Sequence, residues 1–360
     1  MDRRKFCKTS ISTAIAIGMP GYLSGCNKSS PVLPPSDGIT AQAATITGDK
    51  LDSMTRDAID ALDGMNTFIN KGDKVFIKPN FVTFPWANNN NCFHAGECTK
   101  TEIILAVAEE CLKSGAEEVI VGEGSHLPTF DWKHAVTLDG NTDLVTETVR
   151  LSSLHHGKII LACLETDSTS WIDVLSETPL NKIAISSLAA TADKVISIPV
   201  AKTHSWAQLT LASKNYLGIT PLSRYAQWVD NSWWNRGTFD HRSPEAIAQV
   251  YLDIEKSIKT DLSIIDFSIG IEGNGPTRNN GGTTLNMKDR LGTWAIVASK
   301  DIMAADATAA RIMNHDVNSI SQLTMGINMG QGEVREESIE IIGEKLENLH
   351  VSWKKARLMG

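Results

Sequence analysis

Short apolar runs that alternate with amphipathic helices are the feature of this chain that most limits its fold. Lys74 to Pro79 is an apolar run closed by a proline, which is typical of a buried strand. Thr99 to Ser114 has helical apolar spacing, and Thr99 with Glu102 matches a capping box. Further strands are expected over residues 118–121, 194–199, 262–266, 294–298 and 338–342, and further helices over 205–217, 243–259 and 303–313. This alternation predicts an α/β fold with a mostly parallel, doubly wound sheet.

The N-terminal segment has the pattern of an export signal. The residues from Asp2 to Lys8 include the adjacent pair Arg3 and Arg4, and a short apolar stretch follows them. Leu-Ser-Gly-Cys then ends at Cys26, as in a lipobox. We expect residues 1–25 to be a twin-arginine signal peptide. A lipid on Cys26 would anchor the mature chain to a membrane, facing the periplasm or the cell exterior. The alternative is an ordinary secretory signal that contains two arginines.

The rest of the chain divides into a linker and one domain. Residues 26–47 are rich in Ser, Pro, Ala and Thr, which indicates a flexible tether. Residues 48–360 are long enough for a single α/β domain with a large core. Residues 126–190 show the least regular pattern, and we interpret them as an inserted lobe.

The charge of the chain argues against nucleic acid as a partner. The formal net charge is −8, and removal of the basic residues 1–25 makes the mature chain more acidic. Phosphate backbones require a basic protein surface. The membrane is therefore expected as a partner through the lipid on Cys26 rather than through electrostatic attraction.

Two cysteines lie close together in a polar loop. Cys92 and Cys98 could form a local disulfide in an oxidising compartment. The alternative is a metal pair assisted by His94, although no second ligand pair follows at zinc spacing. Cys111 and Cys163 have apolar neighbours and are expected to be buried thiols.

Polar residues follow several of the predicted strands. Ligands of doubly wound sheets bind beyond the carboxyl ends of the strands, so these residues are candidates for a binding site. Three lysines would form a cationic pocket for a carboxylate or phosphate, with amides adding directional hydrogen bonds and glycines allowing close approach. The candidate ligand-binding residues are Lys78, Asn80, Lys202, Lys214, Asn215, Gly273 and Gly275. The alternative is that each lysine is solvated or paired with a nearby acid.

His204 is the leading candidate for proton transfer, because its ordinary pKa lies near neutrality. Asp266 and Glu272 would be its acidic partners. A divalent metal is an open alternative, and the candidate ligands are His204, His241, Asp301 and Asp306. Oxygen ligands would favour magnesium, calcium or manganese. The structural alternative is that His204 binds a backbone carbonyl and orders its loop.

These motifs resemble the domain of unknown function 362 family. The resemblance runs from about Lys74 to Met313. It rests on Ile-Lys-Pro-Asn at 77–80, Lys-Thr-His at 202–204 with Lys-Asn-Tyr-Leu-Gly at 214–218, Glu-Gly-Asn-Gly-Pro at 272–276, and Ser-Lys-Asp at 299–301 with Ala-Asp-Ala at 305–307. Some relatives carry a ferredoxin-like module with clustered cysteines. Because this chain has no C-x-x-C-x-x-C run, an iron–sulfur cluster is not expected. The resemblance assigns no activity.

We therefore expect an exported, lipid-anchored α/β protein with an enzyme-like site for a small anionic ligand. The alternative is a non-catalytic solute-binding or assembly lipoprotein. The tryptophans at 228, 233 and 234 lie in a polar segment and suit either function, since aromatic faces can cover a ligand or pin a loop onto the core. The cofactor and the reaction stay open.

Overall fold

The protein contains one large mixed sheet, described here from a computed structural model. The structure describes residues 38–82, 91–125, 127–229, 232–234 and 236–359. Within these residues the main sheet has 11 strands. Eight form one continuous row, in the order β15 (Ile339–Gly343), β1 (Ala41–Gly48), β14 (Trp294–Ser299), β12 (Leu262–Gly273), β7 (Lys194–Ile198), β2 (Lys74–Pro79), β3 (Glu118–Glu123) and β4 (Lys158–Cys163). Three more strands, β8 (Val200–His204), β9 (Gln208–Thr210) and β13 (Gly282–Asn286), extend from this row.

The sheet is mostly parallel, as the alternating sequence pattern predicts. The pairs β12–β7, β7–β2, β2–β3 and β3–β4 are parallel. Within the row of eight, β14 is the exception, because it pairs antiparallel with both β1 and β12. Outside the row, β13 and β9 also pair antiparallel, with β12 and β8. The connection from β12 to β14 contains the 3-10 helix η4 (Arg278–Asn280), β13, which folds back on β12, and the short helix α10 (Met287–Leu291).

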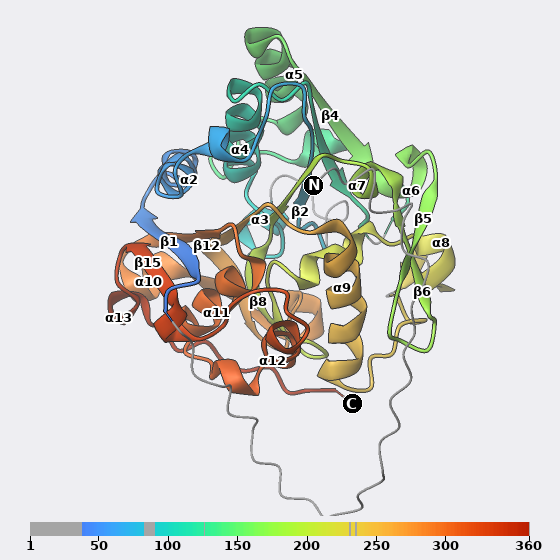
Figure 1. The fold of residues 1–360 in the computed structure, drawn as a ribbon, viewed down its shortest axis with the longest axis vertical. Helices are drawn as coiled ribbons and strands as arrows, with labels where there is room; N and C mark the ends of the chain where they lie inside the picture. Colours follow the sequence, from blue (N-terminus) through green and yellow to red (C-terminus); the bar gives the residue numbers. More distant parts are fainter. Residues whose placement is uncertain (1–37, 83–90, 126, 230–231, 235, 360) are drawn as a thin grey trace, which may run out of the picture.

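Helices cover both faces of the sheet (Figure 1). Successive residues of β2 point to opposite faces: Val75 and Ile77 join one buried apolar cluster, and Phe76 joins the other. One face is covered by α2 (Leu51–Asp60) and α4 (Thr101–Lys113), with α5 (Leu144–His155) against α4. The other face is covered by α9 (Pro244–Ile258), α11 (Ile302–Ile312) and α12 (Ser321–Asn328). This confirms a doubly wound α/β fold.

Short helices lie in the connections between these elements. They are α3 (Asn91–His94), α6 (Leu164–Asp167), α7 (Ser187–Ala190), α8 (Leu222–Tyr225), α10 (Met287–Leu291) and α13 (Leu346–Leu349). Two small separate sheets are formed by β5 (Trp171–Leu175) with β6 (Lys182–Ser186), and by β10 (Gln227–Val229) with β11 (Ser232–Trp234). Of the helix signals in the sequence, the cap before α9 is confirmed, since the Ser243 side chain accepts a hydrogen bond from the Ala246 N–H.

The helix expected over residues 205–217 is wrong. The chain instead forms β9, which pairs antiparallel with β8, and then the 3-10 helix η3 (Lys214–Ile219). Leu209 is buried and lies opposite Thr203 in this hairpin, so its burial comes from extended backbone rather than from the apolar face of a helix. The hairpin places His204 and Lys214 at one end of the sheet.

The capping box expected at Thr99 and Glu102 is also absent. Thr99 Oγ1 instead donates to the Ile198 carbonyl and accepts from the Asn80 N–H, so it joins β7 to the loop after β2. Glu102 accepts from the Leu138 N–H. Both side chains are used in tertiary contacts that local sequence cannot reveal.

Two expected boundaries change in the structure. Residues 41–48 form β1, which pairs with β14 and β15, so the expected 26–47 tether cannot extend past Ala41. Within residues 126–190, β4 is an edge strand of the main sheet rather than part of a separate lobe. The β5–β6 hairpin is the part that stands apart from that sheet. Residues 1–25 and Cys26 lie outside the described residues.

Candidate functional site

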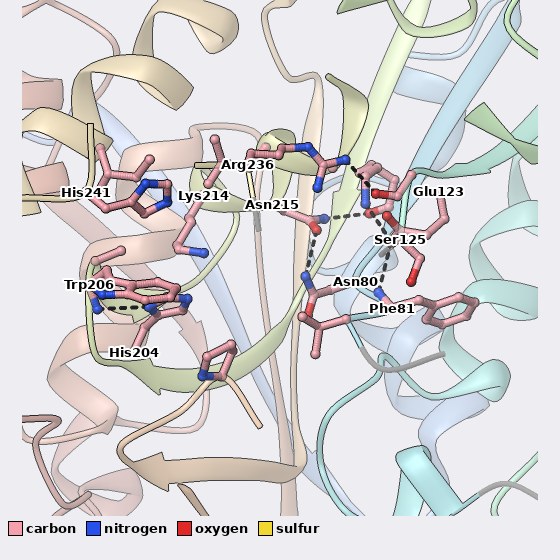
Figure 2. Close-up of a pocket in the computed structure, with 18 residues that line it drawn as sticks. Asn80, Phe81, Glu123, Ser125, His204, Trp206, Lys214, Asn215, Arg236 and His241 are labelled. Carbon is pink, nitrogen blue, oxygen red and sulfur yellow. Dashed lines mark hydrogen bonds and ion pairs between the residues drawn. The ribbon is translucent and has the colours of Figure 1, made fainter. Parts of the chain in front are cut away.

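A pocket of about 130 Å³ lies at the carboxyl ends of β2, β3 and β8 (Figure 2). This is the place where open α/β sheets bind ligands. Titratable and amide side chains converge there from segments far apart in the sequence. The polar and aromatic groups of the lining are Lys78, Asn80, Phe81, Glu123, Ser125, His204, Trp206, Lys214, Asn215, Arg236 and His241.

Lys78 and Glu123 form a buried ion pair at one side of the pocket. Lys78 Nζ lies 2.7 Å from Glu123 Oε2 and also donates to the Pro79 carbonyl at 2.6 Å. The same Glu123 oxygen accepts from the Phe81 N–H at 2.9 Å. Burial lowers the pKa of Lys78, and the attraction of Glu123 opposes that effect. The pair neutralises itself, so its main contribution is to fix the ends of β2 and β3.

The Lys-Asn-x-x-Gly segment ends at Gly218, where the structure leaves no room for a side chain. A Cβ at this position would lie 2.8 Å from both Glu123 Oε1 and Lys78 Nζ. The backbone of η3 can therefore pack against the ion pair only because no side chain is present.

An amide pair forms the floor of the pocket. Asn80 Nδ2 donates to Asn215 Oδ1 at 3.2 Å, and Asn215 Nδ2 donates to the Lys78 carbonyl at 2.7 Å. Lys202 is fully buried beneath them and donates from Nζ to Asn80 Oδ1 at 2.5 Å and to the Glu97 carbonyl at 2.7 Å. Burial lowers the pKa of Lys202 to about 8. Lys202 therefore orients Asn80 and does not line the pocket itself.

Lys214 is the ammonium group that faces the cavity. Figure 2 shows its side chain extending between His241 and His204. Among the residues that the structure describes, no hydrogen bond or ion pair reaches its Nζ. Burial lowers the pKa of Lys214 to about 7, and repulsion from Lys202 and Arg236 adds to the effect. An anion bound in the cavity would offset both the cost of burying the Lys214 ammonium and its repulsion by Lys202 and Arg236.

Arg236 adds a second cation that the sequence reasoning missed. Its Nη2 donates to the Gly124 carbonyl at 2.7 Å, and its Nε donates to Thr220 Oγ1 at 2.8 Å. Burial lowers the pKa of Arg236 to about 10, so the guanidinium stays charged at neutral pH. Its position follows a segment rich in tryptophan, and no sequence motif marks it.

His204 is a neutral hydrogen-bond donor toward the cavity. The Trp206 N–H donates to its Nδ1 at 3.1 Å, so in the neutral ring the hydrogen is on Nε2. Burial, reinforced by the charges of Lys214 and Lys202, lowers the pKa of His204 well below its usual value. We therefore assign His204 the role of donor, with Nδ1 occupied by the backbone.

His241 has the opposite tautomer. Its Nδ1 lies 2.7 Å from the Phe239 carbonyl, which can only accept, so Nδ1 carries the hydrogen and Nε2 is the acceptor. Burial lowers the pKa of His241, and Lys214 contributes in the same direction. The pocket thus has one imidazole that can give a hydrogen bond and one that can take a proton.

Asp266 and Glu272 lie outside this pocket. Asp266 is buried against Lys100, with Nζ 3.0 Å from Oδ2, and accepts from the N–H and Oγ of Ser268. Glu272 binds Arg290 at 2.5 Å and the Lys354 N–H at 2.8 Å. Burial acts to raise the pKa of Glu272, but these hydrogen bonds hold it below its usual value. Neither carboxylate contacts His204, so their catalytic role stays a prediction without geometric support.

The four expected metal ligands are not brought together. Asp301 caps α11 by accepting from the Met303 and Ala304 N–H groups. Asp306 accepts from the N–H groups of Ala212 and Ser213 and from Ser213 Oγ. Across the described residues, no group of three or more His, Cys, Asp or Glu side chains could hold a metal ion. His204 and His241 share the pocket, but in the described part of the chain no third side chain completes a metal site with them.

The remaining predicted residues are structural neighbours of the site. The Gly273 carbonyl accepts from Thr203 Oγ1 at 2.7 Å, and the Gly275 carbonyl accepts from Ser205 Oγ at 2.8 Å. These bonds hold the glycine-proline loop against β8, where Pro276 lines the pocket. Cys92 and Cys98 are buried thiols that are not joined by a disulfide in the structure. The pKa of Cys92 is raised by its hydrogen bond with Cys98 and by burial, so the two thiols are in contact and a disulfide stays a prediction.

Comparison with known proteins supports the family resemblance. The family model described as Domain of unknown function (DUF362) matches residues 75–311, about two thirds of the chain. The chain therefore belongs to this family. A thylakoid-associated protein from Synechocystis sp. is 25% identical over 284 residues, which cover 78% of this chain and 76% of that protein.

Two solved structures resemble the chain at 13% identity. The lactate racemase apoprotein from Thermoanaerobacterium thermosaccharolyticum aligns with a TM-score of 0.36 over 73% of this chain and 55% of the other. A protein from Thermotoga maritima aligns with a TM-score of 0.37 over 64% of this chain and 54% of the other. The chain thus spans just over half the length of each structure. Among the described residues, no helix combines the length and apolarity needed to cross a bilayer.

Proposed function

We propose that this member of the DUF362 family binds a small carboxylate or phosphate in the strand-end pocket. The observation that carries the proposal is Lys214, whose ammonium faces the cavity with no partner among the described residues. A partly buried cation without a counter-ion is costly, and a bound anion removes that cost. Arg236 supplies a second positive charge, while Lys78 is already balanced by Glu123.

The neutral groups around these cations would orient the anion. His204 would donate from Nε2, and the amide network of Asn80 and Asn215 would hold the floor rigid. Lys214, Arg236 and His204 would then supply three hydrogen-bond donors to the anion. Several donors held in fixed positions give directional recognition that a single surface lysine cannot give. The pocket volume of about 130 Å³ suits a small anionic group.

Anion binding can be tested directly by isothermal titration calorimetry at pH 6 with inorganic phosphate, sulfate and small carboxylates. Lys214→Met removes the charge while keeping an unbranched side chain, and we expect it to weaken binding at least tenfold. The matched control is Lys158→Met, because Lys158 is an exposed lysine of the edge strand β4. Equal anion affinity in both variants would reject the proposal.

Proton transfer is the enzyme-like part of the proposal. His241 Nε2 would accept a proton from the bound ligand, and the nearby Lys214 would hold the resulting negative charge. His241→Gln should retain anion binding and abolish conversion of any substrate, measured by mass spectrometry on a panel of carboxylates and phosphate esters. If the unaltered protein binds anions and converts none of the panel, the solute-binding alternative is favoured.

We further propose that the chain is exported by the twin-arginine route and anchored through a lipid on Cys26. The support is the sequence of residues 2–26, and a Synechocystis relative is named as thylakoid-associated. Arg3→Lys with Arg4→Lys should leave unprocessed precursor in the cytoplasm, detected by fractionation. Cys26→Ser should yield a chain that lacks the additional mass of the lipid. Normal export of the double arginine variant would contradict the first part.

A further inference from the structure

One lysine of the anion pocket is placed as a nucleophile. Lys214 lines the cavity, and in the described part of the chain its Nζ has no hydrogen-bond or ion-pair partner. The two other lysines of the site are engaged, because Lys78 is paired with Glu123 and Lys202 donates to Asn80. Of these three lysines, Lys214 is therefore the one whose amine can reach a bound molecule.

The surroundings of Lys214 favour the uncharged amine. Burial and the positive charges of Lys202 and Arg236 lower its pKa to about 7. An ordinary lysine, with a pKa of about 10.4, is almost wholly protonated at neutral pH. Only the uncharged amine has a lone pair that can attack a carbonyl carbon, and lysines beside other cations are activated in this way. The pocket thus keeps part of Lys214 in its reactive form.

Arg236 retains a donor for the anionic end of a ligand. Its Nε binds Thr220 Oγ1, and its Nη2 binds the carbonyls of Gly124 and Thr220. Within the described residues, Nη1 makes no hydrogen bond. The guanidinium is therefore fixed through two of its nitrogens, and the third can donate to a carboxylate in the cavity that Arg236 lines.

Two imidazoles stand beside the amine. Figure 2 shows the Lys214 side chain extending between His204 and His241. His204 Nε2 can donate a hydrogen bond to a carbonyl oxygen, whereas His241 Nε2 can accept a proton. The Trp206 ring lies 5.9 Å from the His204 ring and 5.2 Å from the His241 ring, measured between centroids, and separates the two rings by packing against both. One cavity therefore combines an amine, an oxygen-binding donor and a proton acceptor.

We propose that Lys214 forms a Schiff base with a small oxo acid. The carboxylate of the ligand is held by Arg236, and its carbonyl carbon lies next to the Lys214 amine. Both side chains line one cavity of about 130 Å³, so the carboxylate and the carbonyl are only a few bonds apart. The inference rests on the proposed anion-binding function and adds the chemical class of the ligand.

The proposed reaction is a condensation that releases water. The Lys214 nitrogen lone pair forms a bond to the carbonyl carbon, and the π electrons of the carbonyl move to its oxygen. His241 Nε2 carries one nitrogen proton to that oxygen, which gives a carbinolamine. The nitrogen lone pair then forms the C=N bond and expels the hydroxyl, which takes the second amine proton and leaves as water. Both amine hydrogens end on the departing oxygen, so the step needs no oxidant, reductant or further reactant.

Reductive trapping tests the proposal on the full folded chain. Pyruvate with sodium cyanoborohydride at pH 7.5 would convert the Schiff base into a stable secondary amine, because the hydride of the reagent adds to the imine carbon. We expect a single adduct by intact-mass spectrometry, and peptide mapping should place it on Lys214. The internal reference is the exposed Lys158 of β4, which should carry at least tenfold less label.

Two variants separate the nucleophile from other lysines. Lys214→Arg keeps a cation at this position but has no amine that forms a Schiff base, so its intact mass should show no adduct above the level of Lys158. Lys158→Met is the matched control and should keep the adduct of the unaltered protein. An equal adduct in Lys214→Arg would overturn the assignment of the nucleophile.

Two further measurements test whether a carboxylate directs the reaction. Acetone has a carbonyl but no carboxylate, so the ratio of label on Lys214 to label on Lys158 should be at least tenfold lower with acetone than with pyruvate. Sulfate should compete with pyruvate for Arg236 and slow the labelling of Lys214. Arg236→Gln should slow it as well, and sulfate competition in the unaltered protein decides the point if that variant unfolds without its bonds to Gly124 and Thr220.

The outcomes distinguish this inference from the proposed function. If Lys214→Met weakens phosphate binding but no adduct forms on Lys214, the oxo acid is rejected and the anion site stands. If acetone and pyruvate give the same ratio and sulfate does not compete, Lys214 is an accessible amine without an oxo-acid site, and the inference is rejected. If phosphate binding is insensitive to Lys214, the proposed function is rejected together with this inference.

Discussion

At the scale of single residues, Lys214 is a cation that loses its charge near neutral pH. Its pKa of about 7 reflects burial together with repulsion from Lys202 and Arg236. An anion binds the protonated form, so affinity should be nearly constant below pH 6 and fall about tenfold per pH unit above pH 7. Sulfate is a suitable calorimetric probe, because its own charge does not change in this range.

The matched control for this pH profile is Lys214→Arg. Arginine keeps its charge at all working pH values. Its sulfate affinity should therefore be flat between pH 6 and pH 9, whatever its absolute strength. A profile that falls above pH 7 in both proteins would mean that another group, and not Lys214, controls anion binding.

The same lysine should lower the stability of the empty protein. A lysine in the unfolded chain has a pKa near 10.5, and folding lowers it to about 7. Between these values the unfolded chain binds more protons, so the free energy of unfolding rises with pH across this window. Lys214→Met should therefore raise the melting temperature at pH 6, and the gain should shrink toward pH 10. A gain that stays constant with pH would contradict the lowered pKa.

The two imidazoles give a spectroscopic prediction. In the neutral rings, His204 carries its hydrogen on Nε2 and His241 on Nδ1. Nitrogen-15 NMR of labelled protein at pH 7.5 should show these opposite tautomers. His241→Gln should remove only the second set of signals. Two identical tautomers would overturn the assignment of separate donor and acceptor roles.

At the scale of elements, α11 holds the loop that carries Lys214. Asp306 lies in α11 and receives hydrogen bonds from donors alone: Ala212 N, Ser213 N, Ser213 Oγ and Gln322 Nε2. Burial raises the pKa of Asp306 to about 6, and these donors oppose the shift. The carboxylate is thus a positioning group for the segment that leads into η3.

Asp306→Asn tests that role. The amide NH₂ would face donors and leave buried groups unpaired, so we expect a loss of about 1–3 kcal/mol in the free energy of unfolding. Phosphate affinity should fall as well, because the η3 backbone is no longer fixed. Urea denaturation and calorimetry give the two values, and the control is Asp52→Asn on the exposed surface of α2. Unchanged phosphate affinity would show that η3 is fixed by other contacts.

The sequence predicts those elements whose signals are local. The strand β2 and the helix α9 follow from an apolar run and from a serine cap before proline. The helix expected over residues 205–217 is not found, because Leu209 lies in β9, and the pairing of β9 with β8 is a contact that the local sequence does not reveal. The same limit applies to the site: Lys78 and Lys214 stand in motifs, whereas Arg236 reaches the pocket through a loop with no signature.

At the scale of the whole molecule, polar contacts tie the strand ends to the helices beneath the site. Lys100, at the start of α4, is fully buried against Asp266 in β12, so the pair joins one helical layer to the middle of the sheet. Lys202 lies nearby on β8 and supports Asn80. Lys202 therefore supports the proposed anion pocket through Asn80, whereas the Lys100–Asp266 pair stabilises the attachment of α4 to the sheet.

The final prediction concerns the Lys100–Asp266 pair. Lys100→Met should lower the free energy of unfolding by about 3–5 kcal/mol, because Asp266 would remain buried without its counter-ion and the Ile269 carbonyl would lose its donor. Urea denaturation measures the change, and Lys74→Met is the control, since its bridge to Glu118 is half exposed and should contribute little. Because Lys100 does not line the pocket, the folded fraction should retain phosphate binding within a few fold. A loss of stability no larger than that of the control would show that water or rearrangement already compensates Asp266, and the buried pair could not then be what couples α4 to the sheet.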